Sequence, residues 1–139
     1  MILYVNGQDI RRLVLGDVAE QSVQIIETEP ERFLQVIDTF LKNADQDWKD
    51  LQAIYAVIGP GSATALRSIL SILQTVHFVQ GTVLFALEKS PEEDDRVTLT
   101  RAETQAEAVS TLIPLYQHSP QITISNKDAL GRVADSTTQ

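Results

Sequence analysis

The stretch of residues 51–73, LQAIYAVIGPGSATALRSILSIL, constrains the fold more than any other part of the sequence. Its apolar run, residues 53–58, predicts a buried strand, and the Gly-Pro-Gly of residues 59–61 interrupts that run. Helical spacing of apolar residues resumes directly afterwards, and Ser62 stands where the N-cap of a helix is expected. A buried strand that leads through a tight turn into a helix is the crossover unit of an α/β fold.

Composition narrows the possible functions. A chain of 139 residues is long enough for one core and short for two. Its formal net charge of −8 repels phosphate backbones, so we expect no direct binding to nucleic acid by this chain alone. The sequence has no cysteine, which excludes a disulfide framework and a thiol nucleophile. It has only two histidines, His77 and His118, so we expect no metal site.

No apolar run approaches the roughly 20 residues of a membrane-spanning helix. The first residues, MILYVNGQD, also lack the basic region that precedes the apolar core of a secretion signal. We therefore expect a cytoplasmic protein that does not contact a membrane.

The N-terminal segment predicts three antiparallel strands in succession. Residues 2–5 form a short apolar strand, and Asn6-Gly7 is a hairpin signal. Residues 10–15 form the returning strand, Gly16-Asp17 a second turn, and residues 18–27 a third strand.

The following part of the chain alternates helices and strands. The predicted elements are a helix at 30–44, the strand at 53–58, a helix at 62–78, a strand at 81–88, an acidic loop at 90–96, a helix at 100–113 and a last edge strand at 122–124. We expect residues 1–125 to form a single domain and residues 126–139 a polar, flexible tail.

Three antiparallel strands followed by alternating helices and strands predict a mixed sheet with helices on both faces. This order of elements resembles that of the ribonuclease H-like, actin-like ATPase domain. The expected fold class is therefore α/β.

The turn after the central strand carries a more specific resemblance, to the TsaB (YeaZ) family and its G-P-G-S-x-T-x-L-R signature. That family's members are non-catalytic partners in the synthesis of threonylcarbamoyladenosine in tRNA. A weaker similarity is the Pro114-Leu115-Tyr116 segment, which resembles a P-x-Y near the C-terminus of the family. The resemblance implies that most of a second actin-like lobe is missing. The matching residues of the signature are Gly59, Pro60, Gly61, Ser62, Thr64, Leu66 and Arg67.

The sequence also departs from the family pattern. In the family, the first strand leads into an acidic turn, where actin-like ATPases hold phosphate and metal. Here Asn6-Gly7-Gln8 follows the strand, and Asp9 lies beyond the hairpin signal. This departure argues against ATP hydrolysis by this chain alone.

The Gly-Pro-Gly-Ser turn allows two interpretations. N–H groups at the start of a helix can cradle an anion, although the lysine of a Walker loop is absent. Alternatively, the glycines permit a close approach of strand and helix. Ser62 has no neighbouring base or G-x-S-x-G context, so we assign no catalytic residue. Arg67 can pair either within the chain or with a partner.

The two predicted helices carry the remaining candidates. The first has an apolar arc of about 160° at 100° per residue, which is wider than a single buried stripe needs. On the second, Thr64, Ser68, Ser71 and Thr75 form a small, uncharged face where lysine and glutamate are usual. Either both faces are covered within the domain, or they form a surface for another protein.

We favour the second interpretation, in which helices 30–44 and 62–78 bind a partner. The resemblance implies that this partner is the catalytic TsaD subunit or a second copy of the chain. The candidate interface residues are Phe33, Ile37, Phe40, Leu41, Thr64, Ser68, Ser71, Ile72 and Thr75.

Two functions remain as alternatives. The first is a non-catalytic interaction subunit, without cofactor, that binds a TsaD-like protein or itself. The second is a small-ligand or nucleotide-binding enzyme of the actin-like superfamily. The second function needs a pair of carboxylates around a metal ion, and Asp9 and Asp17 are its candidates.

Overall fold

The computed structural model describes residues 1–116, 127–130 and 133–136, and a six-stranded sheet forms its centre. The strand order is β3-β2-β1-β4-β5-β6. β4 pairs in parallel with β1 and with β5, and the other neighbours pair antiparallel. The strands are β1 (Ile2–Asn6), β2 (Arg12–Asp17), β3 (Ser22–Glu27), β4 (Ala53–Gly59), β5 (Val83–Glu88) and β6 (Glu107–Val109), and a separate pair joins β7 (Lys127–Leu130) to β8 (Val133–Ser136).

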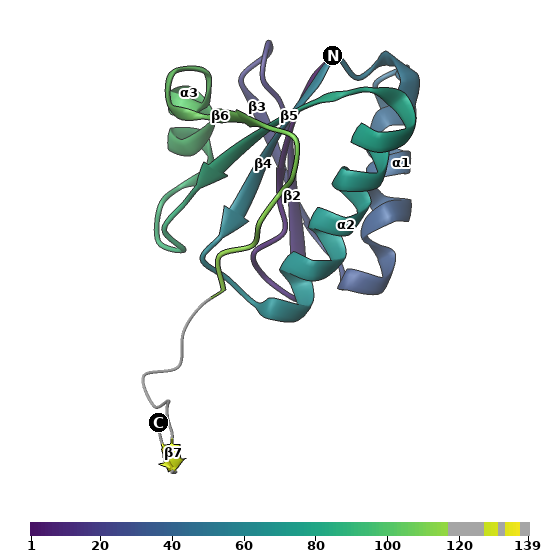
Figure 1. The fold of residues 1–139 in the computed structure, drawn as a ribbon. Helices are drawn as coiled ribbons and strands as arrows, with labels where there is room; N and C mark the ends of the chain where they lie inside the picture. The colour runs from purple at the N-terminus through teal and green to yellow at the C-terminus, as the bar shows by residue number, and fades with distance from the viewer. Residues whose placement is uncertain (117–126, 131–132, 137–139) are drawn as a thin grey trace.

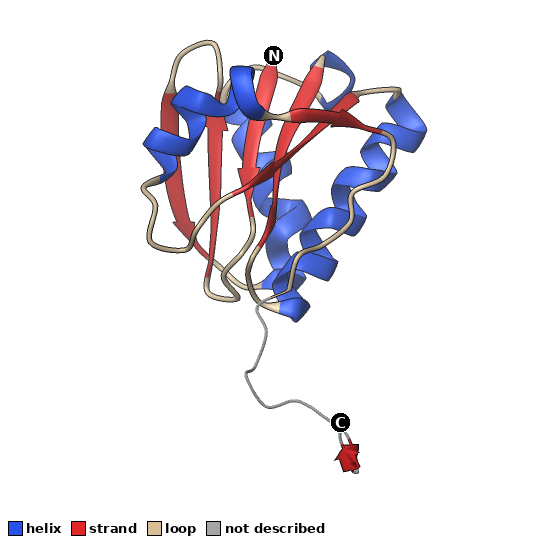
Figure 2. Ribbon diagram, turned by 60° about the vertical axis from the view of Figure 1, so that its left-hand side comes forward, coloured by secondary structure: helices blue, strands red, loops and turns tan. Residues whose placement is uncertain are grey.

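Helices cover both faces of the six-stranded sheet. α1 (Phe33–Asn43) and α2 (Ala63–Gln80) lie side by side on one face, and α3 (Asp95–Gln105) lies on the other (Figures 1 and 2). Short 3-10 turns, η1 (Pro30–Arg32) and η2 (Trp48–Asp50), precede α1 and β4. The predicted α/β mixed sheet with helices on both faces is confirmed.

Strand alternation divides the core into two layers. On β1, Leu3 and Val5 are buried among the residues of α1 and α2, whereas Tyr4 belongs to the cluster on the α3 side. Leu66, Ile69 and Leu73 of α2 fill the first layer. The α1–α2 layer is the larger of the two among the described residues, and it is almost wholly aliphatic.

The strand–turn–helix prediction for residues 51–73 is confirmed. The positions predicted for the second turn of the N-terminal strands and for the helix at 100–113 are wrong. The second turn is not at Gly16-Asp17, because both residues pair within β2. The chain reverses at residues 18–21 instead, where the Asp17 carboxylate accepts the N–H group of Ala19 and Gln21 takes a positive φ of 53°.

The helix predicted at 100–113 begins and ends earlier. The Asp94 side chain accepts the N–H group of Arg96 and caps α3, which starts at Asp95 within the predicted acidic loop. The helix ends before Ala106, which is extended, since the following residues pair with β5 as strand β6.

The strand predicted at 122–124 lies outside the described residues. β7 and β8 fall within the predicted tail, so the division into a domain at 1–125 and a flexible tail at 126–139 stays a prediction. Within the described part of the chain, no helix has the length and apolar character that crossing a membrane requires.

Candidate functional site

The Gly-Pro-Gly-Ser turn lies where β4 ends and α2 begins. The Ser62 hydroxyl accepts the N–H group of Ala65 at 3.3 Å, so Ser62 is the N-cap of α2 as predicted. The Gly59–Pro60 peptide bond is cis. The Ser62 N–H group donates to the Gln8 carbonyl at 2.9 Å, which joins the turn to the loop after β1.

The two glycines of the turn are required by neighbouring backbone. Gly59 has a φ of +135°, a conformation that side chains disfavour, and a Cβ there would collide with the Leu115 carbonyl. A Cβ on Gly61 would lie 2.8 Å from the Gln8 carbonyl oxygen. The glycines therefore have a structural role. They leave space for the backbone of the loops at Gln8 and Leu115, rather than for a closer approach of strand and helix.

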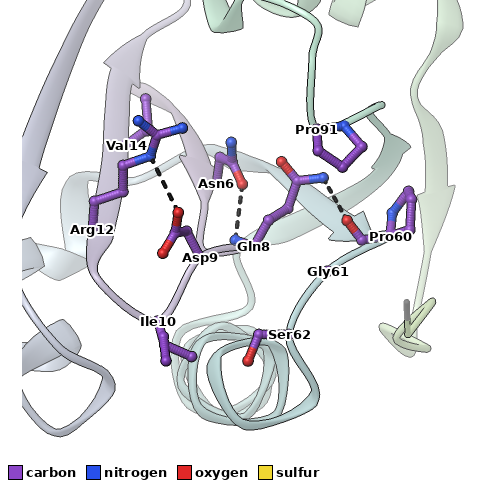
Figure 3. A pocket seen from close by; sticks show the side chains of 10 residues that line it. All are labelled: Asn6, Gln8, Asp9, Ile10, Arg12, Val14, Pro60, Gly61, Ser62 and Pro91. Carbon is purple, nitrogen blue, oxygen red and sulfur yellow. Dashed lines mark hydrogen bonds and ion pairs between the residues drawn. The ribbon is translucent and has the colours of Figure 1, made fainter. Parts of the chain in front are cut away.

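The Gln8 side chain ties three loops together. Its amide nitrogen donates to the Pro60 carbonyl at 2.9 Å and to the Lys89 carbonyl at 2.7 Å. Gln8 is 8% exposed, and its own N–H group donates to the Asn6 side chain (Figure 3). The loops that follow β1, β4 and β5 are thus fixed relative to one another at one end of the sheet.

A cavity of about 270 Å³ opens beside these loops. Figure 3 shows Asp9 and Arg12 on one wall and Ser62 near the start of α2. Asp9 and Arg12 form an ion pair at 3.8 Å, and both side chains are about half exposed, so the pair contributes little to stability. The lining residues are Asn6, Gln8, Asp9, Ile10, Arg12, Val14, Pro60, Gly61, Ser62 and Pro91.

The carboxylate pair required for the nucleotide-binding alternative is not formed. Asp9 precedes β2 and accepts the N–H group of Arg11, whereas Asp17 ends β2 and caps the opposite turn. The length of the strand separates them. Among the described residues, no three His, Cys, Asp or Glu side chains come together as metal ligands.

A buried carboxylate does lie behind the cavity, and sequence reasoning missed it. Asp95, the first residue of α3, is 8% exposed and accepts hydrogen bonds from Tyr4 at 2.7 Å and from the Asn6 amide at 2.8 Å. Burial and the adjacent carboxylate raise the pKa of Tyr4 above its usual value of 10.0. Because Asp95 stands in an acidic run, its sequence context indicated only a solvated loop.

The first predicted helix contributes less to the surface than expected. Phe33, Ile37 and Leu41 are at most 1% exposed and pack in the α1–α2 layer of this chain. Their assignment to an interface is therefore wrong, since the sheet of the same chain covers them. Phe40 is half-buried on the flank of α1 near β3, and Leu34 is 54% exposed.

The second predicted helix does present its uncharged face. Thr64, Ser71 and Thr75 are exposed, and Ile72 is half-buried. Ser68 is half-buried, and its hydroxyl donates to the Pro30 carbonyl at 3.0 Å, so it joins α2 to η1. Arg67 is exposed and forms no ion pair with any residue that the structure describes.

The structure describes one of the two histidines. The Nδ1 atom of His77 lies 2.7 Å from the Thr82 carbonyl, which accounts for this side chain at the end of α2. His118 lies outside the described residues.

The sheet order and the placement of the helices define the class of the protein. Its architecture is that of the ribonuclease H-like, actin-like ATPase domain. Residues 28–88 match the sequence model of the family described as TsaD, tRNA N6-adenosine threonylcarbamoyltransferase. That segment runs from the end of β3 through β5 and includes the Gly-Pro-Gly-Ser turn. No curated protein matches the chain.

Two solved structures with this fold are a YeaZ protein and a protein described as similar to YeaZ. "YeaZ from Pseudomonas aeruginosa" superposes with a TM-score of 0.52 at 18% identity, over 63% of this chain and 43% of that chain. A second structure, described as an uncharacterized protein with similarity to peptidase YEAZ from the same organism, has the same score and identity, over 63% and 42%. The chain is thus TsaB (YeaZ)-like in fold, and it spans less than half the length of these structures.

Proposed function

We propose that this chain is a non-catalytic interaction subunit that acts in the threonylcarbamoyladenosine modification of tRNA. It binds a TsaD-like subunit, or a second copy of itself, through the outer surface of α1 and α2. The observation that carries the proposal is the outward face of α2, which is small, uncharged and exposed.

The face is unusual in a chain of this charge. Between Ala63 and Gln80, Arg67 is the one formally charged residue, although the whole chain carries 30 Asp, Glu, Lys and Arg (19 acidic plus 11 basic). A solvated helix normally presents lysine and glutamate outward. Thr64, Ser71 and Thr75 instead leave room for the close approach of another helix, and their hydroxyl groups cost less to desolvate than charged groups do.

Apolar side chains flank this face. Leu34 on α1 is 54% exposed, and at the end of α2 Phe78 is 88% exposed and Val79 67% exposed. Exposed aromatic and aliphatic groups with few charged residues among them are typical of protein interfaces. The TsaB resemblance agrees, because it implies that the equivalent helices pack against the catalytic subunit or a second copy.

The site beside the turn argues for a role without chemistry. Asn6 ends β1, and its amide donates to Asp95. Gly7 and Gln8 follow, where the family resemblance implies an acidic turn. Leu115 and Gln8 occupy the space around the glycines. We propose that the chain needs a partner for catalysis, binds no cofactor and, with its net charge of −8, does not hold tRNA alone in the cytoplasm.

The test compares two glutamate substitutions on opposite faces. Ser71→Glu places a charge in the middle of the proposed interface. Thr104→Glu, the control, places the same charge at an exposed position of α3. Each variant is co-expressed with the TsaD-like protein of the same cell, and the complex is isolated through a tag on that protein.

We expect Ser71→Glu to reduce complex recovery about tenfold or more, since an unpaired charge must be desolvated, while Thr104→Glu leaves it unchanged. Sedimentation of each variant alone reports self-association. Equal recovery of all three proteins would exclude this face as the interface, and no complex with wild type would exclude the TsaD-like partner. Ser68→Glu is unsuitable, because Ser68 binds the Pro30 carbonyl.

A further inference from the structure

The edge of the sheet at β3 has no neighbour among the described residues. β3 pairs with β2 on one side, and none of the described strands lies on the other. The Thr28 N–H group donates to the Arg11 carbonyl. Since hydrogen-bonded and non-hydrogen-bonded residue pairs alternate along an antiparallel pair of strands, this bond shows which residues of β3 bond to β2. Even-numbered residues of β3 therefore bond to β2, and the N–H and C=O groups of Val23, Ile25 and Glu27 point outward.

This edge lacks most of the features that usually prevent strand addition, and Glu27 is its one charged residue. Its six pairs with β2 run without a bulge, and residues 22–27 contain neither proline nor lysine. Ile25 is 59% exposed on the strand. At the opposite edge, β6 is only three residues long. β3 is thus the edge that can accept another strand.

A groove follows the β3 edge along the flank of α1. It consists of two cavities of about 400 and about 440 Å³, which share Phe40 as a lining residue. Ile26 of β3 and Val36 of α1 join Phe40 in lining the first cavity. An added strand would place alternate side chains over these three apolar residues while its backbone pairs with β3.

The charges of the groove differ between its two ends. The end at the β2–β3 turn is lined by Asp17 and Glu20, without lysine or arginine. The ammonium group of Met1, which also lines this end, donates to the Asp50 carbonyl. At the other end Glu27 and Arg32 balance each other. A strand antiparallel to β3 would finish at the acidic end.

We propose that β3 and α1 form a docking site for an extended peptide of a partner protein. The peptide adds antiparallel to β3, carries alternating apolar residues and has lysine or arginine near its carboxyl-terminal end. Its main chain pairs with Val23, Ile25 and Glu27, its apolar side chains contact Phe40, and its basic residues face Asp17 and Glu20. This surface is separate from the outer face of α2.

The experiment selects peptides from a displayed library of random ten-residue sequences on three immobilised proteins. Ile25→Pro removes an outward N–H group without removing a bond to β2. Ile25→Thr is its matched control, because it loses the same apolar side chain and keeps the N–H group. We expect peptides enriched on wild type to bind Ile25→Thr within about threefold and Ile25→Pro at least about tenfold more weakly.

Charge reversal provides a second variant that does not depend on proline. Glu20 is exposed, so Glu20→Lys leaves the core intact, and we expect it to remove the preference for basic residues at the carboxyl-terminal end of the selected peptides. No enrichment on wild type, or equal binding to Ile25→Pro, overturns the proposal. Concentration-dependent dimerisation of wild type that Ile25→Pro abolishes, without peptide capture, would assign the edge to a second copy and also overturn it.

Discussion

The two faces of the sheet are covered in physically different ways. α1 and α2 are attached through a nearly continuous aliphatic layer that includes Leu66 and Leu73. α3 is shorter than α2, and its first turn is attached through buried polar contacts of Asp95. Apolar packing tolerates many partners and specifies position weakly, whereas a buried carboxylate with two donors specifies one arrangement. The exposed residues Thr64, Ser71 and Thr75 of α2 are therefore free to serve association, since the buried face of α2 and the bond from Ser68 to Pro30 attach the helix.

Cavity formation on the aliphatic side should have the largest effect on stability. Leu73 is fully buried between α2 and the sheet. We expect Leu73→Ala to lower the free energy of unfolding by about 3 kcal/mol, within the roughly 2–5 kcal/mol range of such truncations. Urea unfolding of the two proteins measures the difference. A loss below about 1 kcal/mol would show that the α1–α2 layer is less tightly packed than described.

Removal of the buried carboxylate on the other face should cost somewhat less. Asp95→Ala leaves the Tyr4 hydroxyl and the Asn6 amide buried without their acceptor, at about 1–3 kcal/mol for each group. We expect a total loss of about 2–3 kcal/mol, measured by urea unfolding. Amide exchange should also become faster in α3 and stay unchanged in α2. Uniform acceleration in both helices would contradict the separation of the two faces.

The Tyr4→Phe variant tests the polar contacts on the α3 side of the sheet through the pH dependence of stability. The variant loses one bond to Asp95, and we expect a loss of about 1–2 kcal/mol at pH 7. The raised pKa of Tyr4 means that above pH 10 the unfolded chain releases a proton that the folded chain keeps. Wild type should then lose about 1.4 kcal/mol per pH unit from this group as pH rises.

Tyr4→Phe lacks this contribution, so the stability difference between the two proteins should shrink above pH 10. Thermal melts between pH 8 and pH 11 test this, with the other tyrosines as a common background. A difference that stays constant across that range would mean that Tyr4 ionises in the folded protein as easily as in the unfolded one.

Substitutions on the exposed surfaces of α2 and α3 should have the smallest effects on stability. We expect Ser71→Glu and Thr104→Glu each to change the free energy of unfolding by less than about 0.5 kcal/mol, since both side chains are exposed. Thermal melts of the isolated proteins measure this. A large loss in Ser71→Glu alone would mean that the α2 face is packed within the chain rather than available to a partner.

Local patterns predicted local structure well. The apolar run, the glycines and Ser62 identified β4, the turn and the cap of α2, because these features depend on neighbouring residues. The helix expected at 100–113 was wrong, because Glu107–Val109 pair with the edge of β5, more than 20 residues earlier in the chain. The apolar periodicity of a segment does not show whether a distant strand has a free edge with which the segment can pair.

The candidate site shows the same limit more clearly. The wide apolar arc of α1 did not reveal that Phe33, Ile37 and Leu41 face the sheet, because two sides of one helix can both be apolar. Asp95 was missed because its partners, Tyr4 and Asn6, lie 91 and 89 positions away in the sequence. Among the interface candidates, Thr64, Ser71 and Thr75 are exposed, and Phe40, Ser68 and Ile72 are half-buried.

The contact between Gly59 and Leu115 has a consequence for the order in which the chain folds. β1 pairs with β4 at a separation of 51 residues, so this pairing can form once about half of the chain has left the ribosome. The Leu115 N–H group donates to the Ile58 carbonyl at 2.8 Å, across a separation of 57 residues, and this bond completes the surroundings of the turn. Because distant contacts close slowly, the most recognisable motif of the sequence should be among the last parts of the described fold to reach its final form.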